Sequence, residues 1–169
     1  RSLGFLSPIV VRYKVFMQQL CETKMKWDES IPETLVVQRN KLVSALQEAQ
    51  PLTIPRCYFA EVHGEILFYR LCGYCDASLS ASYATVIYLF IKTEEGCHMK
   101  FVVAKTRVAP LKKQTIPRLE LLSAVLLARL MDTTGTSLIP ELNISHCHCY
   151  TNSQVVHCWI CNTGRSWKP

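Results

Sequence analysis

The stretch "TIPRLELLSAVLLARLM", residues 115–131, decides the fold. It predicts a helix, because Thr115 suits the N-cap and Pro117 suits the first turn. The helix is apolar on nearly all sides, so we expect it to be buried against a sheet. One acid, Glu120, interrupts this apolar sequence. An unpaired carboxylate in such surroundings costs several kcal/mol, so Glu120 needs a structural or functional explanation.

The segments around this helix have the patterns of β-strands. Three runs precede it, at residues 65–78, 82–96 and 98–108. Short connections make these three an antiparallel meander. A Gly/Ser/Pro-rich loop is predicted at 135–140, then a fourth strand at 141–150 and a helix at 153–161. A strand that returns after a crossover helix should lie parallel to one of the first three. The predicted fold class is therefore α/β, with a mixed sheet.

Two helices are predicted before the sheet. Residues 9–27 and 32–50 have apolar residues at mostly helical spacing, and a linker follows at 52–56. These helices are too small to form an independent core. We therefore predict a two-helix appendage over residues 1–54 and a sheet domain over residues 55–169.

The composition is that of a reduced, intracellular protein with a packed core. Of the 169 residues, 49% are hydrophobic and 19% are charged, which is the balance of a globular chain. The cysteine count of nine is odd and no secretory signal precedes it, so we predict free thiols. No apolar run reaches the roughly 18 to 20 residues that a bilayer requires, so no membrane partner is expected. The chain begins with Arg1, which indicates a piece of a longer protein.

The net charge of +6 is concentrated in one segment, residues 97–131. Its cations are Lys100, Lys105, Arg107, Lys112, Lys113, Arg118 and Arg129. Glu120 is the single acid there, so this segment alone accounts for the whole net charge. A basic segment of this kind suits a polyanion such as nucleic acid. On charge alone, a solvated surface connection remains the better explanation.

Two acids and an amide occupy positions that a sheet can bring together. Asp76 ends the first strand, Glu120 lies in the first turns of the crossover helix, and Asn152 follows the returning strand. Singly, each has a structural explanation, such as a turn for Asp76 or an ion pair of Glu120 with Arg118 or Arg129. Together they can converge, and clustered carboxylates repel one another unless divalent cations neutralise them. Such clusters hold the metals of two-metal phosphodiester chemistry.

The stretch "HCHCYTNSQVVHCWIC", residues 146–161, also permits a zinc-stabilised interaction module as an alternative. Cys158 and Cys161 have the spacing of zinc ligands. Alternation along a strand would direct His146 and His148 to one face and the interleaved cysteines to the other. No second well-spaced ligand pair is present, so the zinc hypothesis is disfavoured.

Four stretches of the chain resemble the BEL/Pao class of LTR retrotransposon polyproteins. They are "LGFLSP" (3–8), "CDASLSASYATVIYL" (75–89), "VAKTRVAPLKKQTIPRLELLSAVLLARL" (103–130) and "YTNSQVVHCWI" (150–160). The resemblance implies the end of a reverse transcriptase, thumb or connection, followed by a ribonuclease H domain. It also implies Mg²⁺-dependent hydrolysis of RNA in RNA–DNA hybrids, and a Pol polyprotein that includes reverse transcriptase and integrase. The implied location is the cytoplasm, the nucleus or a virus-like particle.

The resemblance also assigns roles to individual residues. Asp76 and Glu120 match catalytic, metal-binding carboxylates, and Asn152 stands where the family has an aspartate. The residues expected to bind nucleic acid are Lys105, Arg107, Lys112, Lys113 and Arg118. A neutral amide is a weak Mg²⁺ ligand, and the family's fourth carboxylate lies beyond Pro169. We therefore expect a C-terminally truncated ribonuclease H-like domain with little or no activity. The alternative is a non-catalytic nucleic-acid-binding or structural module on the same fold.

Overall fold

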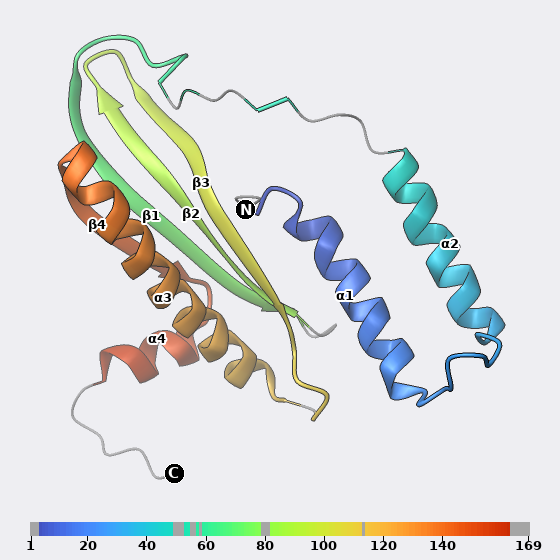
Figure 1. Ribbon diagram of the computed structural model, residues 1–169. Coiled ribbons are helices and arrows are strands. Elements are labelled where there is room, and N and C mark those ends of the chain that lie inside the picture. Colours follow the sequence, from blue (N-terminus) through green and yellow to red (C-terminus); the bar gives the residue numbers. More distant parts are fainter. Residues whose placement is uncertain are drawn as a thin grey trace.

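The structure, a computed structural model, describes residues 4–48, 53–54, 57, 59–78, 82–112 and 114–162. The elements are α1 (Ser7–Glu22), α2 (Glu33–Gln47), β1 (Ile66–Ser78), β2 (Ser82–Thr93), β3 (Cys97–Val108), α3 (Ile116–Leu142), β4 (Ile144–Thr151) and α4 (Gln154–Cys161). The strands form one sheet in the order β3-β2-β1-β4, and α3 crosses one face of it (Figure 1). β1 pairs antiparallel with β2 and parallel with β4, and β2 pairs antiparallel with β3. The mixed sheet with a meander, a crossover helix and a parallel returning strand is therefore confirmed.

The two faces of the sheet have different surroundings. The inner face packs against α3 and forms the core, whose buried members are Leu71, Cys75, Ile87, Leu89, Ile91, Val102, Leu127, Met131 and Ile144. Because successive strand residues alternate between faces, Tyr74 and Asp76 of β1 lie on the opposite, outer face. α3 therefore covers only one side of the sheet.

α3 packs closely on β1 at Gly73. A Cβ atom added to Gly73 would lie 2.5 Å from Cδ1 of Leu127 and 2.7 Å from Cε of Met131. Both of these α3 side chains are buried in the core. The absence of a side chain at Gly73 thus permits the close packing of helix on sheet.

The loop predicted at residues 135–140 is wrong, because α3 continues to Leu142. Three hydroxyls donate to the carbonyl four residues earlier, at 2.9 to 3.1 Å: Thr133, Thr136 and Ser137. Thr134 and Gly135 are buried, and Leu142 packs against the core. Burial of this continued stripe outweighs the weak helix propensity of glycine and threonine. The helix ends at Asn143, whose φ of 48° is left-handed and whose N–H donates to the Ile139 carbonyl.

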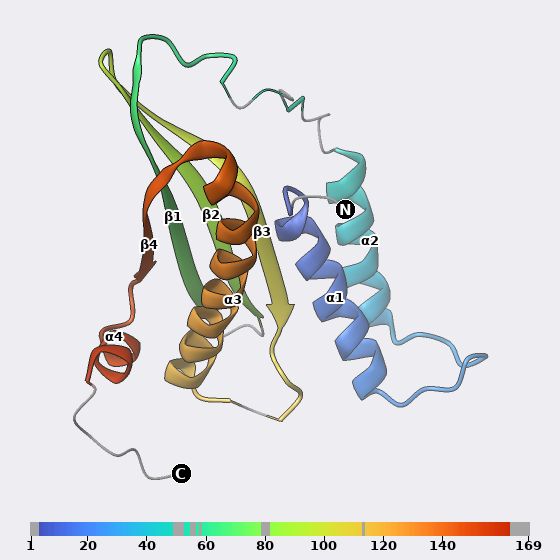
Figure 2. The ribbon, with the colours of Figure 1, turned by 60° about the vertical axis from the view of Figure 1, so that its left-hand side comes forward.

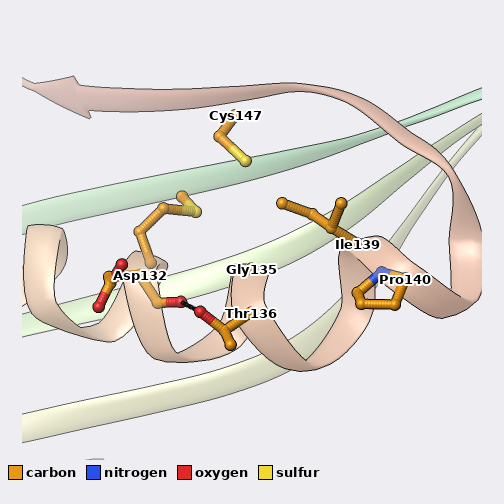
Figure 3. A pocket seen from close by; sticks show the side chains of 7 residues that line it. Asp132, Gly135, Thr136, Ile139, Pro140 and Cys147 are labelled. Carbon is orange, nitrogen blue, oxygen red and sulfur yellow. Dashed lines mark hydrogen bonds between the residues drawn. The ribbon is translucent and has the colours of Figure 1, made fainter.

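A shallow groove of about 460 Å³ separates the second half of α3 from β4 (Figure 3). Gly135 leaves space on the helix side, and Cys147 lines the groove from β4. The rings of His146 and His148 lie 6.0 Å apart on the other face. The predicted separation of these histidines from the interleaved cysteines is thereby confirmed.

The N-terminal segment contacts the outer face of the sheet at β3. Gly4 has a φ of +92°, and a Cβ there would lie 2.1 Å from the Ala104 carbonyl oxygen. The ring of Phe5 lies 4.0 Å from that of Phe101, measured between centroids. These contacts fix the start of α1, which runs beside β3 (Figure 2).

The helices α1 and α2 pack on each other next to the sheet. The Tyr13 hydroxyl donates to the Leu42 carbonyl at 3.0 Å, and the Gln18 side chain donates to the Ala109 carbonyl at 2.9 Å. The predicted boundary between residues 54 and 55 falls at the margin of the described residues, since residue 55 lies outside them. Within the described part of the chain, none of the helices has the length and hydropathy needed to cross a membrane.

Candidate active site

Asp76 and Asn152 each follow directly after the last pair of the parallel ladder between β1 and β4. That pair is Cys75 of β1 with Thr151 of β4. Both Asp76 and Asn152 are exposed to solvent. The register therefore puts the first acid and the amide at the same end of the sheet.

The Asp76 carboxylate is held partly by its own backbone. Its Oδ1 atom accepts a hydrogen bond from the Ala77 N–H at 2.8 Å. Asp76 also lines a cavity of about 370 Å³ on the outer face, between the sheet and the N-terminal segment. The rings of Phe5, Tyr74 and Tyr88 contribute to the walls of this cavity. Asp76 is thus an acceptor in a solvent-accessible position next to aromatic rings.

Glu120 is joined to the end of β4 by a hydrogen bond. The Ser153 hydroxyl donates to Oε2 of Glu120 at 2.6 Å, and Ser153 directly follows Asn152. Within the described residues, Glu120 forms no ion pair with Arg118 or Arg129, the two partners that the sequence suggested. The half-buried carboxylate is stabilised by a hydroxyl, and this contact brings Glu120 to the same corner of the sheet as Asn152.

Ser153 was not identified as a site residue from the sequence. It is 7% exposed, and its hydroxyl also accepts from the Val156 N–H at 3.2 Å, which makes it the N-cap of α4. Two patterns could have pointed to it: a serine directly before an apolar helical run, and a buried glutamate that requires a donor. One hydroxyl thus connects α3, the end of β4 and the first turn of α4.

Replacing Ser153 with alanine is expected to release Glu120 and weaken α4. Loss of the cap alone should lower the free energy of unfolding by about 1 kcal/mol. Loss of the donor to a partly buried carboxylate should add to this cost. Urea denaturation measures the sum. Ser153→Thr, which keeps the hydroxyl, is the control and should retain most of the stability; equal losses in both variants would contradict the assigned role.

The side chains of Asp76, Glu120 and Asn152 carry hard oxygen donors, the type of ligand that Mg²⁺ prefers, and their total charge is low. In the parts of the chain that the structure describes, no three His, Cys, Asp or Glu side chains are grouped to hold a metal ion. Burial raises the pKa of the Cys149 thiol, which disfavours the thiolate that zinc requires.

The predicted nucleic-acid-binding residues that the structure describes lie on the opposite edge strand, on the segment that follows it and in the first turn of α3. Asp76, Ala84 and Thr106 form one rung across β1, β2 and β3, so Lys105 and Arg107 flank its far end. Two strand spacings, about 10 Å, separate the backbones of β1 and β3. Lys105, Arg107, Lys112 and Arg118 are all exposed. Lys113 lies outside the described residues.

Comparison with protein families gives one match over most of the chain. A family model described as "Pao retrotransposon-like RNaseH-like domain" matches residues 2–153. The matched range includes the two N-terminal helices, the whole sheet and the three residues Asp76, Glu120 and Asn152. A comparison with curated proteins found no match.

Proposed function

Since this chain belongs to the family of Pao retrotransposon-like RNase H-like domains, we propose that it binds RNA–DNA hybrids as part of a Pol polyprotein. We propose further that its Mg²⁺-dependent ribonuclease site is impaired. The sheet end that carries Asp76, Asn152 and Glu120 would be the reaction site. The exposed cations of β3 and the following loop would contact the phosphates.

The observation that carries this proposal is the hydrogen bond from Ser153 to Glu120. It ties an acid of the crossover helix to the end of β4, where Thr151 pairs with Cys75, the residue before Asp76. On this proposal, three elements distant in sequence supply oxygen ligands near the same end of the sheet. If these residues served only as solvated surface acids or helix caps, they would not need to lie near the same end of the sheet.

The proposed impairment follows from the low negative charge of the site. Bound Mg²⁺ in such a site activates water and stabilises the leaving oxygen. Asp76 and Glu120 supply two negative charges, whereas the Asn152 amide supplies none. A divalent cation is therefore held more weakly here than by three carboxylates, and a pair of cations more weakly still. Asp76 and Glu120 would hold the ion, and Ser153 would orient Glu120.

We propose two kinds of partner. The family assignment favours nucleic acid and the other domains of the polyprotein, namely reverse transcriptase and integrase. The descent of residues 1–54 from a reverse-transcriptase thumb or connection stays a prediction. The packing of α1 against β3 supports a role for these helices beside the ribonuclease H-like sheet.

The test combines hybrid binding with hybrid cleavage. We expect the unmodified chain to bind an RNA–DNA hybrid of about 18 base pairs with strong salt dependence, because cations release counterions from phosphates. Lys112→Glu combined with Lys113→Glu should weaken binding and make the log–log salt slope shallower by about two. Lys14→Glu combined with Lys41→Glu, at exposed positions of α1 and α2, is the matched control.

The results of the binding and cleavage assays distinguish the candidate functions. Absence of hybrid binding at low salt would contradict the nucleic-acid role. Fast, EDTA-sensitive cleavage that Glu120→Gln abolishes would contradict the impairment. Binding without cleavage at any Mg²⁺ concentration is the expected result for the unmodified chain. The same result for Asn152→Asp in a C-terminally extended chain that also supplies the family's fourth carboxylate would favour the second candidate, a non-catalytic binding module.

A further inference from the structure

Four aromatic rings form a continuous row on the outer face of β4 and β1. The centroid distances are 6.0 Å from His146 to His148, 6.3 Å from His148 to Tyr150 and 5.0 Å from Tyr150 to Tyr74. The interplanar angles are 26°, 25° and 16°, so successive rings are nearly parallel. The row follows from alternation, because residues two apart in a strand share one face. We call these four residues the ring row.

The ring row is accessible to a ligand. Tyr150 is 46% exposed and Tyr74 is 39% exposed, and His146 is also exposed. α3 covers the other face of the sheet, and α1 runs beside β3, at the opposite edge from β4 (Figures 1 and 2). The N-terminal segment lies over β3 on this outer face and shares a cavity with Tyr74, while His146 and Tyr150 on β4 remain exposed. Large rings exposed in series indicate an interaction surface.

The spacing of the rings suits nucleobases. Stacked bases are about 3.4 Å apart, so one base inserted between two flat groups separates them by about 6.8 Å. The distances of 6.0 and 6.3 Å along β4 are close to this value. An unpaired base could therefore insert between neighbouring rings after a small adjustment. A base pair within a duplex could not, because its faces are already stacked.

The charges on the outer face favour a polyanion. Arg70 pairs with His146 in the β1–β4 ladder, and Lys92 lies on the same face through its pairing with Phe68. The Arg70 guanidinium carbon lies 4.5 Å from the Phe68 ring centroid, and its Nε is buried without a hydrogen-bond partner among the described residues. Asp76 is the only acid in the four strands that the structure describes.

The Tyr74 and Tyr150 rings are stacked at a centroid distance of 5.0 Å, at the end of the ring row nearest Asp76. The row ends two residues before Asp76 in β1 and two residues before Asn152, so a strand bound there would lead to the candidate active site.

We propose that the ring row binds single-stranded nucleic acid, with bases stacked on the rings of β4 and Tyr74 and with phosphates near Arg70 and Lys92. This inference goes beyond hybrid binding, because it names a different surface and a different form of nucleic acid. Stacking on aromatic rings tolerates any base, so DNA and RNA strands of simple sequence should both bind. The bound strand runs along β4 toward Asp76.

The experiment measures fluorescence anisotropy of labelled twelve-residue oligo-dT and oligo-U with the 169-residue chain. The unmodified chain should bind both. Tyr74→Ala combined with Tyr150→Ala should weaken binding by roughly tenfold or more, because each ring supports a stacked base. Tyr74→Phe combined with Tyr150→Phe keeps both rings and should restore binding. Arg70→Gln should weaken binding and make the salt slope shallower by about one. Circular dichroism checks that each variant is folded.

The controls separate this proposal from hybrid binding and from other occupants of the face. Lys14→Glu combined with Lys41→Glu makes a matched charge change elsewhere and should leave strand binding unchanged. Binding of the hybrid but of neither oligonucleotide would overturn the ring-row proposal and leave the proposed function standing. Equal affinities of the alanine and unmodified chains would also overturn it. A dimer in sedimentation that the alanine variant dissociates, without any strand binding, would assign the face to a second copy of the chain.

Discussion

Replacing Asn152 with aspartate is expected to tighten Mg²⁺ binding by about tenfold or more. The substitution changes one amide into a carboxylate of nearly the same shape, and in the proposed site Asp76 and Glu120 supply the other negative charges. A charge added within a few ångströms of a divalent cation should change the binding free energy by more than roughly 1.4 kcal/mol, the value that corresponds to a tenfold change in affinity. Isothermal titration calorimetry with Mg²⁺ measures the difference directly.

The control for this prediction is Asn143→Asp, which makes the same substitution at the other end of β4. Asn143 caps α3 and lies nine residues before Asn152, so about 30 Å of strand separates the two positions. This variant should bind Mg²⁺ no better than the unmodified chain. An equal gain in both variants would mean that net charge, and not the geometry at the end of β1 and β4, determines affinity.

The Asn152→Asp variant should also make stability depend on the metal. Three carboxylates at one corner repel one another when no cation is present. In EDTA we therefore expect a lower melting temperature than for the unmodified chain, and in excess Mg²⁺ we expect recovery of that loss by mass action. A melting temperature that does not respond to Mg²⁺ would show that the three groups do not converge on a shared ion.

Replacing Gly73 with valine is expected to cost about 3 kcal/mol or more of the free energy of unfolding. The new Cβ would lie well inside contact distance of Leu127 and Met131, both of which are buried under α3. Overpacking of this kind forces side chains off their rotamers or displaces the helix. Gly73→Ala should cost less, since the contacts are with side-chain ends that can move. Urea denaturation ranks the variants.

Two further variants sharpen the Gly73 prediction. Gly96→Ala is the matched control, because a Cβ at Gly96 would meet nothing within 4 Å, and its effect should stay within about 0.5 kcal/mol. Met131→Ala opens space opposite Gly73. Combined with Gly73→Val, it should therefore destabilise by less than the sum of the two single changes. Strict additivity would contradict a direct contact between these positions.

The topology, and with it the position of Asp76 and Asn152 at the same end of the sheet, could be predicted because both depend on local patterns. Strands of period two, a capped apolar helix and a returning strand leave few arrangements, and a parallel return next to β1 puts the two residues at one end of the sheet. The continuation of α3 through Gly135 could not be predicted, since it depends on burial against β1 and β4. The ring row required the register of β1 on β4, which sequence alone does not provide. The same holds for the Ser153–Glu120 contact, which depends on the angle between α3 and α4.

The parallel pairing of β1 with β4 has a consequence for the order of folding. The hairpins that join β1, β2 and β3 close over short loops, whereas the contact between Cys75 and Tyr150 joins residues 75 positions apart. Long-range pairing requires more loop-closure entropy and is reached more slowly. We therefore expect the three-strand meander to form first and β4 to dock after α3 has packed. The corner that carries Asp76, Glu120 and Asn152 would then be the last part of the sheet to assemble, and the first to open when the chain begins to unfold.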